Sequence, residues 1–409
     1  MPETSVCPRC GRSISSEQTQ CTCGWTSPSA AIHSRESDLA VVFVVLVSLF
    51  LVTGALIKLA NDKEKSLAQY WYRRGNEDLA KARFAVAIDD FSNSLVYSRD
   101  NNLFERRLAE AFVADGRLEE ARGHLEGLWD RAPSNGIVNL ELARLAAKRG
   151  DAENAVRYYN NAIYGVWDGT TDQQQRRRDT QFELYRFLAS QGQDAQADAL
   201  LMTIAAGLPA NPALHVQVGN LLYKDGLFQR ALGEFRAALQ VDRSQRDALA
   251  GAGESAFQLG DYPNAVRYLD QAVRAKNPDA QARQFLDIAR AVLELDPFDP
   301  RLGAGERGRR ASRAFGLAVA RLKSCAQEKG EDLTAKSPQT DLQNLYSRVR
   351  KTQLQSSPLY LERHTDEIAP LMDLTADLEE GAAKGCGESS DAADRALLLL
   401  ARRRGGAQL

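Results

Sequence analysis

The chain's six cysteines are the residues whose spacing points most directly to chemistry. Four lie close to the N-terminus, as Cys7-Pro-Arg-Cys10-Gly and Cys21-Thr-Cys23-Gly. Thiolates bind zinc well, and a glycine after each pair lets the backbone turn tightly around a shared ion. Four sulfurs complete a tetrahedral structural site and leave no open position for catalysis. We therefore predict that Cys7, Cys10, Cys21 and Cys23 bind one structural Zn²⁺.

This N-terminal segment is too short to bury a core, so metal binding would supply its folding free energy. Residues 7–25 resemble the small zinc ribbons at the N-terminus of many bacterial membrane proteins, although the second pair is Cys-x-Cys rather than Cys-x-x-Cys. The resemblance implies a zinc-ribbon-like module over residues 1–30. The alternative is two disulfides or unligated thiols.

The remaining cysteines, Cys325 and Cys386, lie in the last quarter of the chain. They are candidates for a disulfide if this part of the chain lies outside the cytoplasm. The alternative is two buried free thiols.

A second feature is the uncharged run from Leu39 to Ile57, which is bounded by Asp38 and Lys58. As a helix it would be roughly 28 Å long, close to the ~30 Å of a bilayer core. A buried core helix is usually shorter and keeps a polar stripe. A cleaved signal peptide would begin nearer residue 1. We expect an uncleaved transmembrane helix over residues 39–59.

Beyond this run the sequence repeats itself. Three sets of positions recur with a period of 34 and share one longer interval of 42. The first set is alanine, at Ala87, Ala121, Ala155, Ala197, Ala231 and Ala265. The second is glycine, at Gly116, Gly150, Gly192, Gly226 and Gly260. The third is large and apolar, at Phe91, Leu125, Tyr159, Leu201, Phe235 and Leu269.

These columns predict a repeated helix–turn–helix unit, with the glycine in the turn and the alanine where helix B contacts helix A. Small residues form a matching column on helix A, except that Tyr185 occupies it in the fourth repeat. The pattern resembles the tetratricopeptide-repeat (TPR) family over about residues 68–279. The resemblance implies an all-α solenoid over 68–297, with six repeats and a capping helix. The insertion behind the longer interval falls within 166–178, where it lengthens a loop or a helix.

In TPR proteins helix A lines a concave surface that binds peptides. Carrying the family's groove positions onto this register yields a set that leans basic, with interspersed aromatics, and would suit an acidic or extended peptide. Exposed Arg and Lys that only keep helices soluble are the alternative. The candidate groove residues are Tyr72, Asn76, Arg107, Arg144, Lys148, Arg186, Asn220, Tyr223 and Lys224, with Glu110, Leu140, Phe182, Glu254 and Phe257 beside them.

The repeat register is lost after residue 297. Residues 280–295 predict the capping helix, and two prolines and three glycines between 297 and 308 mark a boundary. Apolar spacing predicts helices over 313–329, 340–353, 359–383 and 390–404. We expect a helical C-terminal domain over residues 303–409.

Two arguments on membrane orientation disagree. Lysines and arginines are more numerous after the apolar run than before it, which favours a cytoplasmic solenoid. A four-thiolate site instead requires a reducing compartment, and long domains translocate with little regard for charge. We predict a single-pass protein of a bacterial inner membrane, with a cytoplasmic N-terminus and a periplasmic solenoid.

The remaining residues do not suggest catalysis. Four scattered histidines share no spacing, and the sequence has no phosphate-binding glycine loop, nucleophile elbow or His-Glu-x-x-His pair. The net charge of −2 and the few basic residues near the cysteines do not favour nucleic acid. We predict no enzyme and no small-molecule substrate, but a membrane-anchored scaffold that binds a partner protein or peptide.

Cell-envelope assembly or the organisation of a complex is the expected setting. The chain weakly resembles bacterial envelope-assembly adaptors, in which a metal-binding module follows the repeats rather than preceding them. The alternative is a membrane-spanning regulator, whose zinc ribbon recruits or senses on one side while the repeats read the other.

Overall fold

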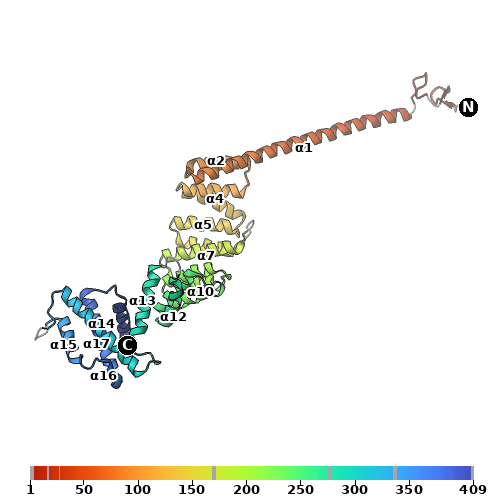
Figure 1. The fold of residues 1–409 in the computed structure, drawn as a ribbon. Coiled ribbons are helices and arrows are strands. Elements are labelled where there is room, and N and C mark those ends of the chain that lie inside the picture. The colour runs from red at the N-terminus through yellow and green to blue at the C-terminus, as the bar shows by residue number, and fades with distance from the viewer. Residues whose placement is uncertain are drawn as a thin grey trace. The chain divides into compact units, whose positions relative to one another are not determined.

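The computed structural model describes residues 4–15, 18–26, 28–167, 172–274, 279–334 and 339–406, with side chains for all of these except 28–38 and 404–406. The chain folds mainly into helices and divides into two compact units, Met1–Thr180 and Gln181–Leu409 (Figure 1). Three parts of the predictions extend beyond the described residues. These are residues 1–3, 16–17 and 27 of the predicted 1–30 module, residues 168–171 of the insertion, and residues 335–338 and 407–409 of the C-terminal region.

The first unit begins with a small β-module. Strands β1 (Thr4–Val6) and β2 (Ser13–Ser15) pair antiparallel. An isolated antiparallel bridge joins Gln20 to Thr26. Cys7, Ile14 and Cys21 are buried at its centre, with Cys23 and Trp25 packed against them. The core of this module is small, with only these three residues buried among the residues that the structure describes there.

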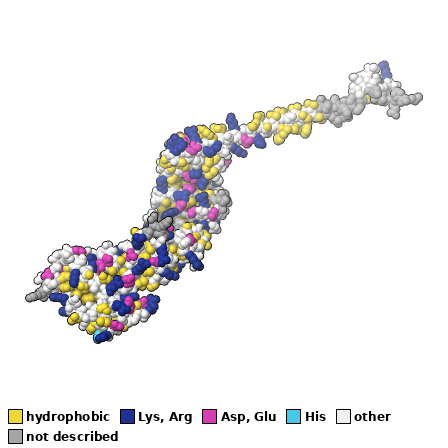
Figure 2. Space-filling model, in the orientation of Figure 1, with side chains coloured by type: hydrophobic (Ala, Val, Ile, Leu, Met, Phe, Trp, Pro, Cys, Tyr) yellow, Lys and Arg dark blue, Asp and Glu magenta, His cyan; other side chains and the backbone are white. Residues whose placement is uncertain are grey.

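Helix α1 runs from Pro28 to Ala80 without a break. Its apolar side chains from Leu39 to Leu59 are exposed, and Figure 2 shows them as a continuous hydrophobic band along the helix. From Leu39 onwards it is long and apolar enough to cross a membrane, and none of its most apolar stretch is buried within the protein. The helix does not end at residue 59, because neither proline nor glycine occurs between 59 and 74 to break it. Its last turns form helix A of the first repeat.

Paired helices follow α1 in both units. The first unit contains α2 (Phe84–Tyr97), α3 (Asn102–Ala114), α4 (Leu118–Arg131), α5 (Gly136–Lys148) and α6 (Ala152–Tyr164). Helix α7 (Gln173–Ser190) enters the second unit, which continues with α8 (Asp194–Ala206), α9 (Pro212–Lys224), α10 (Phe228–Val241), α11 (Arg246–Gln258) and α12 (Tyr262–Val273). Helix α13 (Ala280–Leu295) follows as the predicted cap.

The three sequence columns have the predicted structural roles. Every residue of the alanine column is at most 2% exposed, and every residue of the large apolar column is at most 5% exposed. All five column glycines have positive φ, between 68° and 83°, in the turns between helices A and B. Six helix pairs and a capping helix are therefore confirmed.

Small residues on helix A make room for the large residues on helix B. A Cβ added to Gly219 would lie 2.7 Å from the ring of Phe235, and one added to Gly253 would lie 2.5 Å from Leu269. The fourth repeat departs from this pattern, as its sequence suggested. There Tyr185 is buried, and its hydroxyl donates a hydrogen bond to Asp225 Oδ2 at 2.7 Å.

The insertion between repeats three and four both lengthens a loop and adds length to α7. Its buried anchor is Trp167, whose Nε1 donates a hydrogen bond to the carbonyl of Ala162 at 3.0 Å. The ring packs so closely on Gly136 that an added Cβ would lie 2.6 Å from it. The backbone of Val166 also forms a parallel bridge with Asn135. The insertion is thus fastened to the start of α5.

The C-terminal region is helical, with α14 (Ala304–Glu328), α15 (Asp341–Thr352), α16 (Pro358–Arg363), the 3₁₀ turn η1 (Thr365–Glu367), α17 (Ile368–Cys386) and α18 (Ala392–Gly406). The prediction of one helix over 359–383 is wrong. The chain breaks at His364, and Pro370 lies in the first turn of α17, where its missing N–H costs no helical bond.

A single hydrophobic core joins the last repeat to this C-terminal region. It runs through α11, α12, α13, α14, α17 and α18, and includes Phe257, Leu286, Phe315, Leu378 and Leu397. The C-terminal helices therefore pack directly on the end of the repeats within the second unit.

Candidate metal centre and binding surfaces

The four N-terminal sulfurs are brought together. Their Sγ atoms all lie within 4.8 Å of one another. The Sγ atoms of Cys7 and Cys23 are 3.7 Å apart, and those of Cys10 and Cys21 are 3.6 Å apart. A Zn–S bond of about 2.3 Å gives a tetrahedron whose edges are about 3.8 Å. These two separations match the edge of such a tetrahedron, and all four sulfurs are close enough together to bind one metal ion.

Backbone turns hold the two cysteine pairs in place. The N–H of Gly11 donates to the carbonyl of Cys7 at 2.9 Å, and the N–H of Gly24 donates to that of Cys21 at 2.8 Å. Both glycines have positive φ, 73° and 85°, a backbone conformation that other residues rarely adopt. The Cys-x-Cys pair thus forms a turn like that of the Cys-x-x-Cys pair.

The pKa values of two of these thiols are shifted in opposite directions. A hydrogen bond from the backbone of Cys23 helps lower the pKa of Cys21 to about 6. Although a backbone hydrogen bond from Arg12 lowers the pKa of Cys10, its neighbouring sulfurs and burial raise it to about 12. Without a metal, one thiolate would therefore be stabilised by its protonated neighbours, whereas four thiolates at this spacing require a bound cation.

In the first unit, the predicted groove residues already have partners within the chain. Tyr72 stacks on Phe104 with ring centroids 4.7 Å apart. The guanidinium of Arg107 contacts Glu110 at 2.6 Å. Lys148 Nζ donates to the carbonyl of Val113 at 2.9 Å. Asn76 donates to the carbonyl of Tyr72 in its own helix, and Arg144 pairs with Glu141. These side chains partly serve to connect neighbouring repeats.

The predicted groove residues of the second unit differ from those of the first. Arg186, Asn220 and Lys224 are exposed, and their side chains have no partner among the residues that the structure describes. Tyr223 lies beside them, half-buried, and its hydroxyl accepts a hydrogen bond from Gln258. We call these four residues the helix A row of the second unit.

The row leads to Glu254 and Phe257 on α11. Burial and the nearby Asp279 raise the pKa of Glu254 to about 7, although Gln281 donates a hydrogen bond to the carboxylate. The ring of Phe257 is buried and lies 4.7 Å from that of Phe285 on α13. The end of the row is therefore more apolar than its middle.

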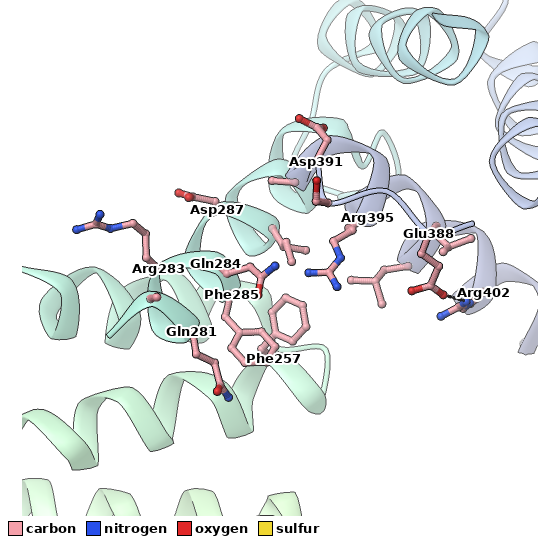
Figure 3. Close-up of a pocket in the computed structure, with 16 residues that line it drawn as sticks. Phe257, Gln281, Arg283, Gln284, Phe285, Asp287, Glu388, Asp391, Arg395 and Arg402 are labelled. Carbon is pink, nitrogen blue, oxygen red and sulfur yellow. Dashed lines mark hydrogen bonds and ion pairs between the residues drawn. The ribbon is translucent and has the colours of Figure 1, made fainter. Parts of the chain in front are cut away.

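A cavity of about 970 Å³ lies at this end, between α13 and α18 (Figure 3). No sequence pattern predicted it, because its two walls are far apart in the chain and α18 lies outside the repeats.

Cys325 and Cys386 form a disulfide that joins α14 to the end of α17. The segment directly after Cys386 supplies Glu388, Ser390 and Asp391 to the cavity wall. The disulfide thus fixes one edge of the cavity.

Comparison with known proteins identifies the repeats. Residues 72–136, 106–169 and 218–280 match the model of the tetratricopeptide-repeat family. No curated protein matches the chain.

Several solved structures are similar in part. YrrB, described as a TPR protein with an unusual peptide-binding site, is 18% identical over 47% of this chain and 94% of its own, with a TM-score of 0.34. The C-terminal part of a TPR protein from Cytophaga hutchinsonii is 14% identical over 55% of this chain and 86% of its own, with a TM-score of 0.40. PilW, a type IV pilus biogenesis factor, is 17% identical over 54% of this chain and 98% of its own, with a TM-score of 0.36.

Proposed function

Because the chain carries tetratricopeptide repeats, we propose that it is a membrane-anchored scaffold that binds a partner protein or peptide along helix A. The observation that carries this proposal is the helix A row of the second unit. Three exposed side chains there, Arg186, Asn220 and Lys224, have no partner among the described residues. A cationic row with a neighbouring tyrosine suits an extended acidic segment, which would gain charge-assisted hydrogen bonds.

The anchor in this proposal is the apolar part of α1, which continues into the first repeat. Its exposed leucines, valines and phenylalanines would be costly in water and are the expected surface of a helix in lipid. The partner would then be tethered to a membrane. Assembly of a cell-envelope complex is a role that suits such an arrangement.

A photo-crosslinking experiment tests the scaffold. A benzophenone amino acid replaces Asn220 in the row, and in a control protein replaces Arg236, which is exposed on helix B. In living cells, the position 220 variant should form discrete adducts that mass spectrometry identifies as one partner, and the position 236 variant should not. Equal adducts at both positions, or none at position 220, would contradict the proposal.

For the N-terminal module we propose a structural zinc site held by Cys7, Cys10, Cys21 and Cys23. The proposal is supported by the four sulfurs, which all lie within 4.8 Å of one another, and by the two glycine turns beside them. Purified protein should contain one zinc per chain by elemental analysis, and the double variant Cys7→Ser/Cys23→Ser should lose it. Replacing Cys325 and Cys386 with serine is the matched control and should leave the zinc content unchanged.

A further inference from the structure

The cavity between α13 and α18 continues the helix A row of the second unit. Phe257 belongs to the row's own register, one repeat after Tyr223, and Ile288 lies one repeat after Glu254. Both residues line the cavity. Helix α18 packs against α13. A peptide that binds along the row therefore reaches this pocket, and α18 forms a wall at the far end of the pocket.

One side of this pocket is apolar. Figure 3 shows the rings of Phe257 and Phe285 next to each other in the pocket lining. Leu398 and Leu399 of α18 line the facing wall. Its volume of about 970 Å³ is at the upper end of the range for ligand pockets, about 300–1,000 Å³, so it can accept a large side chain together with its backbone.

A single cation faces this apolar side without a partner. Arg395 extends from α18 into the centre of the pocket (Figure 3). Among the described residues no carboxylate lies within ion-pair distance of its guanidinium. Arg283, which also lines the pocket, points away from it in the same view.

The acidic residues nearby do not compensate Arg395. Glu388 pairs with Arg402 at 2.6 Å. Asp391 accepts hydrogen bonds from the backbone N–H groups of Ala393 and Asp394, at the start of α18. Asp287 extends from the opposite wall, away from Arg395 (Figure 3). The pocket therefore combines an apolar surface with a half-buried guanidinium that is free to bind an anion.

We propose that this pocket binds the C-terminal residue of an extended partner peptide. This inference rests on the proposed binding along helix A. The apolar side chain of the last residue packs on Phe257 and Phe285, and its α-carboxylate binds Arg395. A C-terminal residue fits because it carries a carboxylate and an apolar side chain on the same Cα, and because a chain that stops here does not collide with α18. Arginine suits the task, since its planar fork binds a carboxylate through two parallel hydrogen bonds.

Two synthetic peptide pools test this proposal. Each pool consists of fluorescein-labelled decapeptides rich in Asp and Glu that end in Leu, Ile, Val or Phe. One pool ends in a free carboxylate and the other in an amide. Fluorescence anisotropy with the full-length protein in detergent should show that the free acids bind at least about tenfold more tightly than the amides, as expected for a charge-assisted bidentate contact.

Variants then assign the effect to the pocket. Arg395→Ala and Arg395→Gln should both abolish the preference for the free acid, and Arg283→Ala, which removes the same charge from the rim, should preserve it. Equal affinity for acid and amide in the wild type, or a preference that survives in both Arg395 variants, would overturn the proposal.

The same assay separates this inference from the proposed function. The double variant Arg186→Ala/Lys224→Ala should weaken both pools by a similar factor. If it does so while the two pools bind equally, the helix A row binds peptide and the pocket does not recognise a C-terminus. If neither pool binds but position 220 forms crosslinks in cells, the C-terminal pocket is again refuted and the scaffold stands.

Discussion

Ala82 adopts a backbone conformation that glycine adopts in the other repeats. Its φ is 56°, and it lies one full repeat before Gly116, the first column glycine. An L-residue in the left-handed region pays a steric penalty that glycine avoids. Its side chain is exposed, so no packing contact offsets the cost.

We therefore expect Ala82→Gly to stabilise the first repeat by about 0.5–1 kcal/mol, although glycine also loses more entropy on folding. Urea unfolding of the full-length protein in detergent would measure the change. The reciprocal substitution Gly116→Ala, at the equivalent turn, should destabilise by a similar amount. A loss of stability in Ala82→Gly would show that this turn is not strained.

Glu379 on α17 is a second residue that lowers the stability of the folded protein. Its side chain is 3% exposed, and its Oε1 has no hydrogen-bond partner among the residues that the structure describes. Burial and the nearby Asp394 raise its pKa from 4.5 to about 8. The folded protein therefore keeps a proton that the unfolded chain releases above pH 4.5, so stability falls as the pH rises from about 4.5 to about 8.

Glu379→Gln should remove this dependence, because glutamine stays neutral. We expect it to stabilise the second unit at pH 7.5 by about 1–3 kcal/mol and to have little effect near pH 4.5. Thermal unfolding at a series of pH values would test both parts. The exposed neighbour Glu380 provides the control, since Glu380→Gln should leave the pH profile unchanged.

At the scale of elements, Phe235 connects two consecutive repeats. A Cβ added to Gly219, in its own repeat, would lie 2.7 Å from the ring, and one added to Gly251, in the next repeat, would lie 2.3 Å from it. The phenylalanine ring of α10 thus packs against backbone on both α9 and α11. Phe235 therefore not only fills its own repeat but also fixes the distance to the next one.

This contact predicts a non-additive pair of substitutions. Gly251→Ala should destabilise the second unit by about 1–3 kcal/mol through overpacking, and Phe235→Leu should also destabilise it by leaving a cavity. The double variant should be more stable than the sum of the two single losses predicts, by at least about 0.5 kcal/mol. The reason is that leucine makes room for the new methyl group. Additive losses in urea unfolding would exclude a direct contact.

The repeats could be predicted from sequence because their packing is local and periodic. Each alanine, glycine and large apolar residue repeats one geometric requirement, so a column of letters reports a contact between helices. The clustering of the four cysteines was predictable from their spacing, since that spacing allows two turns that bring the four sulfurs together. Structural features that occur only once in the chain leave weaker patterns in the sequence than the repeats do. The break at His364, between α16 and α17, has no counterpart in the repeats, and the burial of Trp167 depends on Gly136 at the start of α5.

The binding surfaces show a different limit of sequence analysis. The register placed Lys148 and Arg107 on helix A, but it could not show that the first donates to a backbone carbonyl and the second pairs with Glu110. It could not find Arg395 at all, because α18 does not repeat and reaches the helix A row only in three dimensions. Position in a repeat predicts which face a side chain is on, and not whether that side chain is free.

At the scale of the whole molecule, the cysteines divide into two chemical states along the chain. The four before the apolar part of α1 are not joined in disulfides, and the two after it are joined in one. Free zinc-binding thiols persist in reducing compartments and structural disulfides in oxidising ones. If α1 crosses a membrane once, the two groups of cysteines lie on opposite sides of it, and we propose that the N-terminus is cytoplasmic and the repeats are on the outer side.

This orientation predicts the outcome of a labelling experiment in intact bacterial cells. Ser244 is exposed in the second unit, so the variant Ser244→Cys should react with a membrane-impermeant maleimide before the cells are permeabilised. The N-terminal cysteines should react only after permeabilisation and zinc chelation, because both a membrane and a metal protect them. Labelling of Ser244→Cys only after permeabilisation would place the repeats in the cytoplasm, as the count of positive charges suggests. In that case the disulfide would have to be absent in cells, which electrophoresis of alkylated protein without reductant would show.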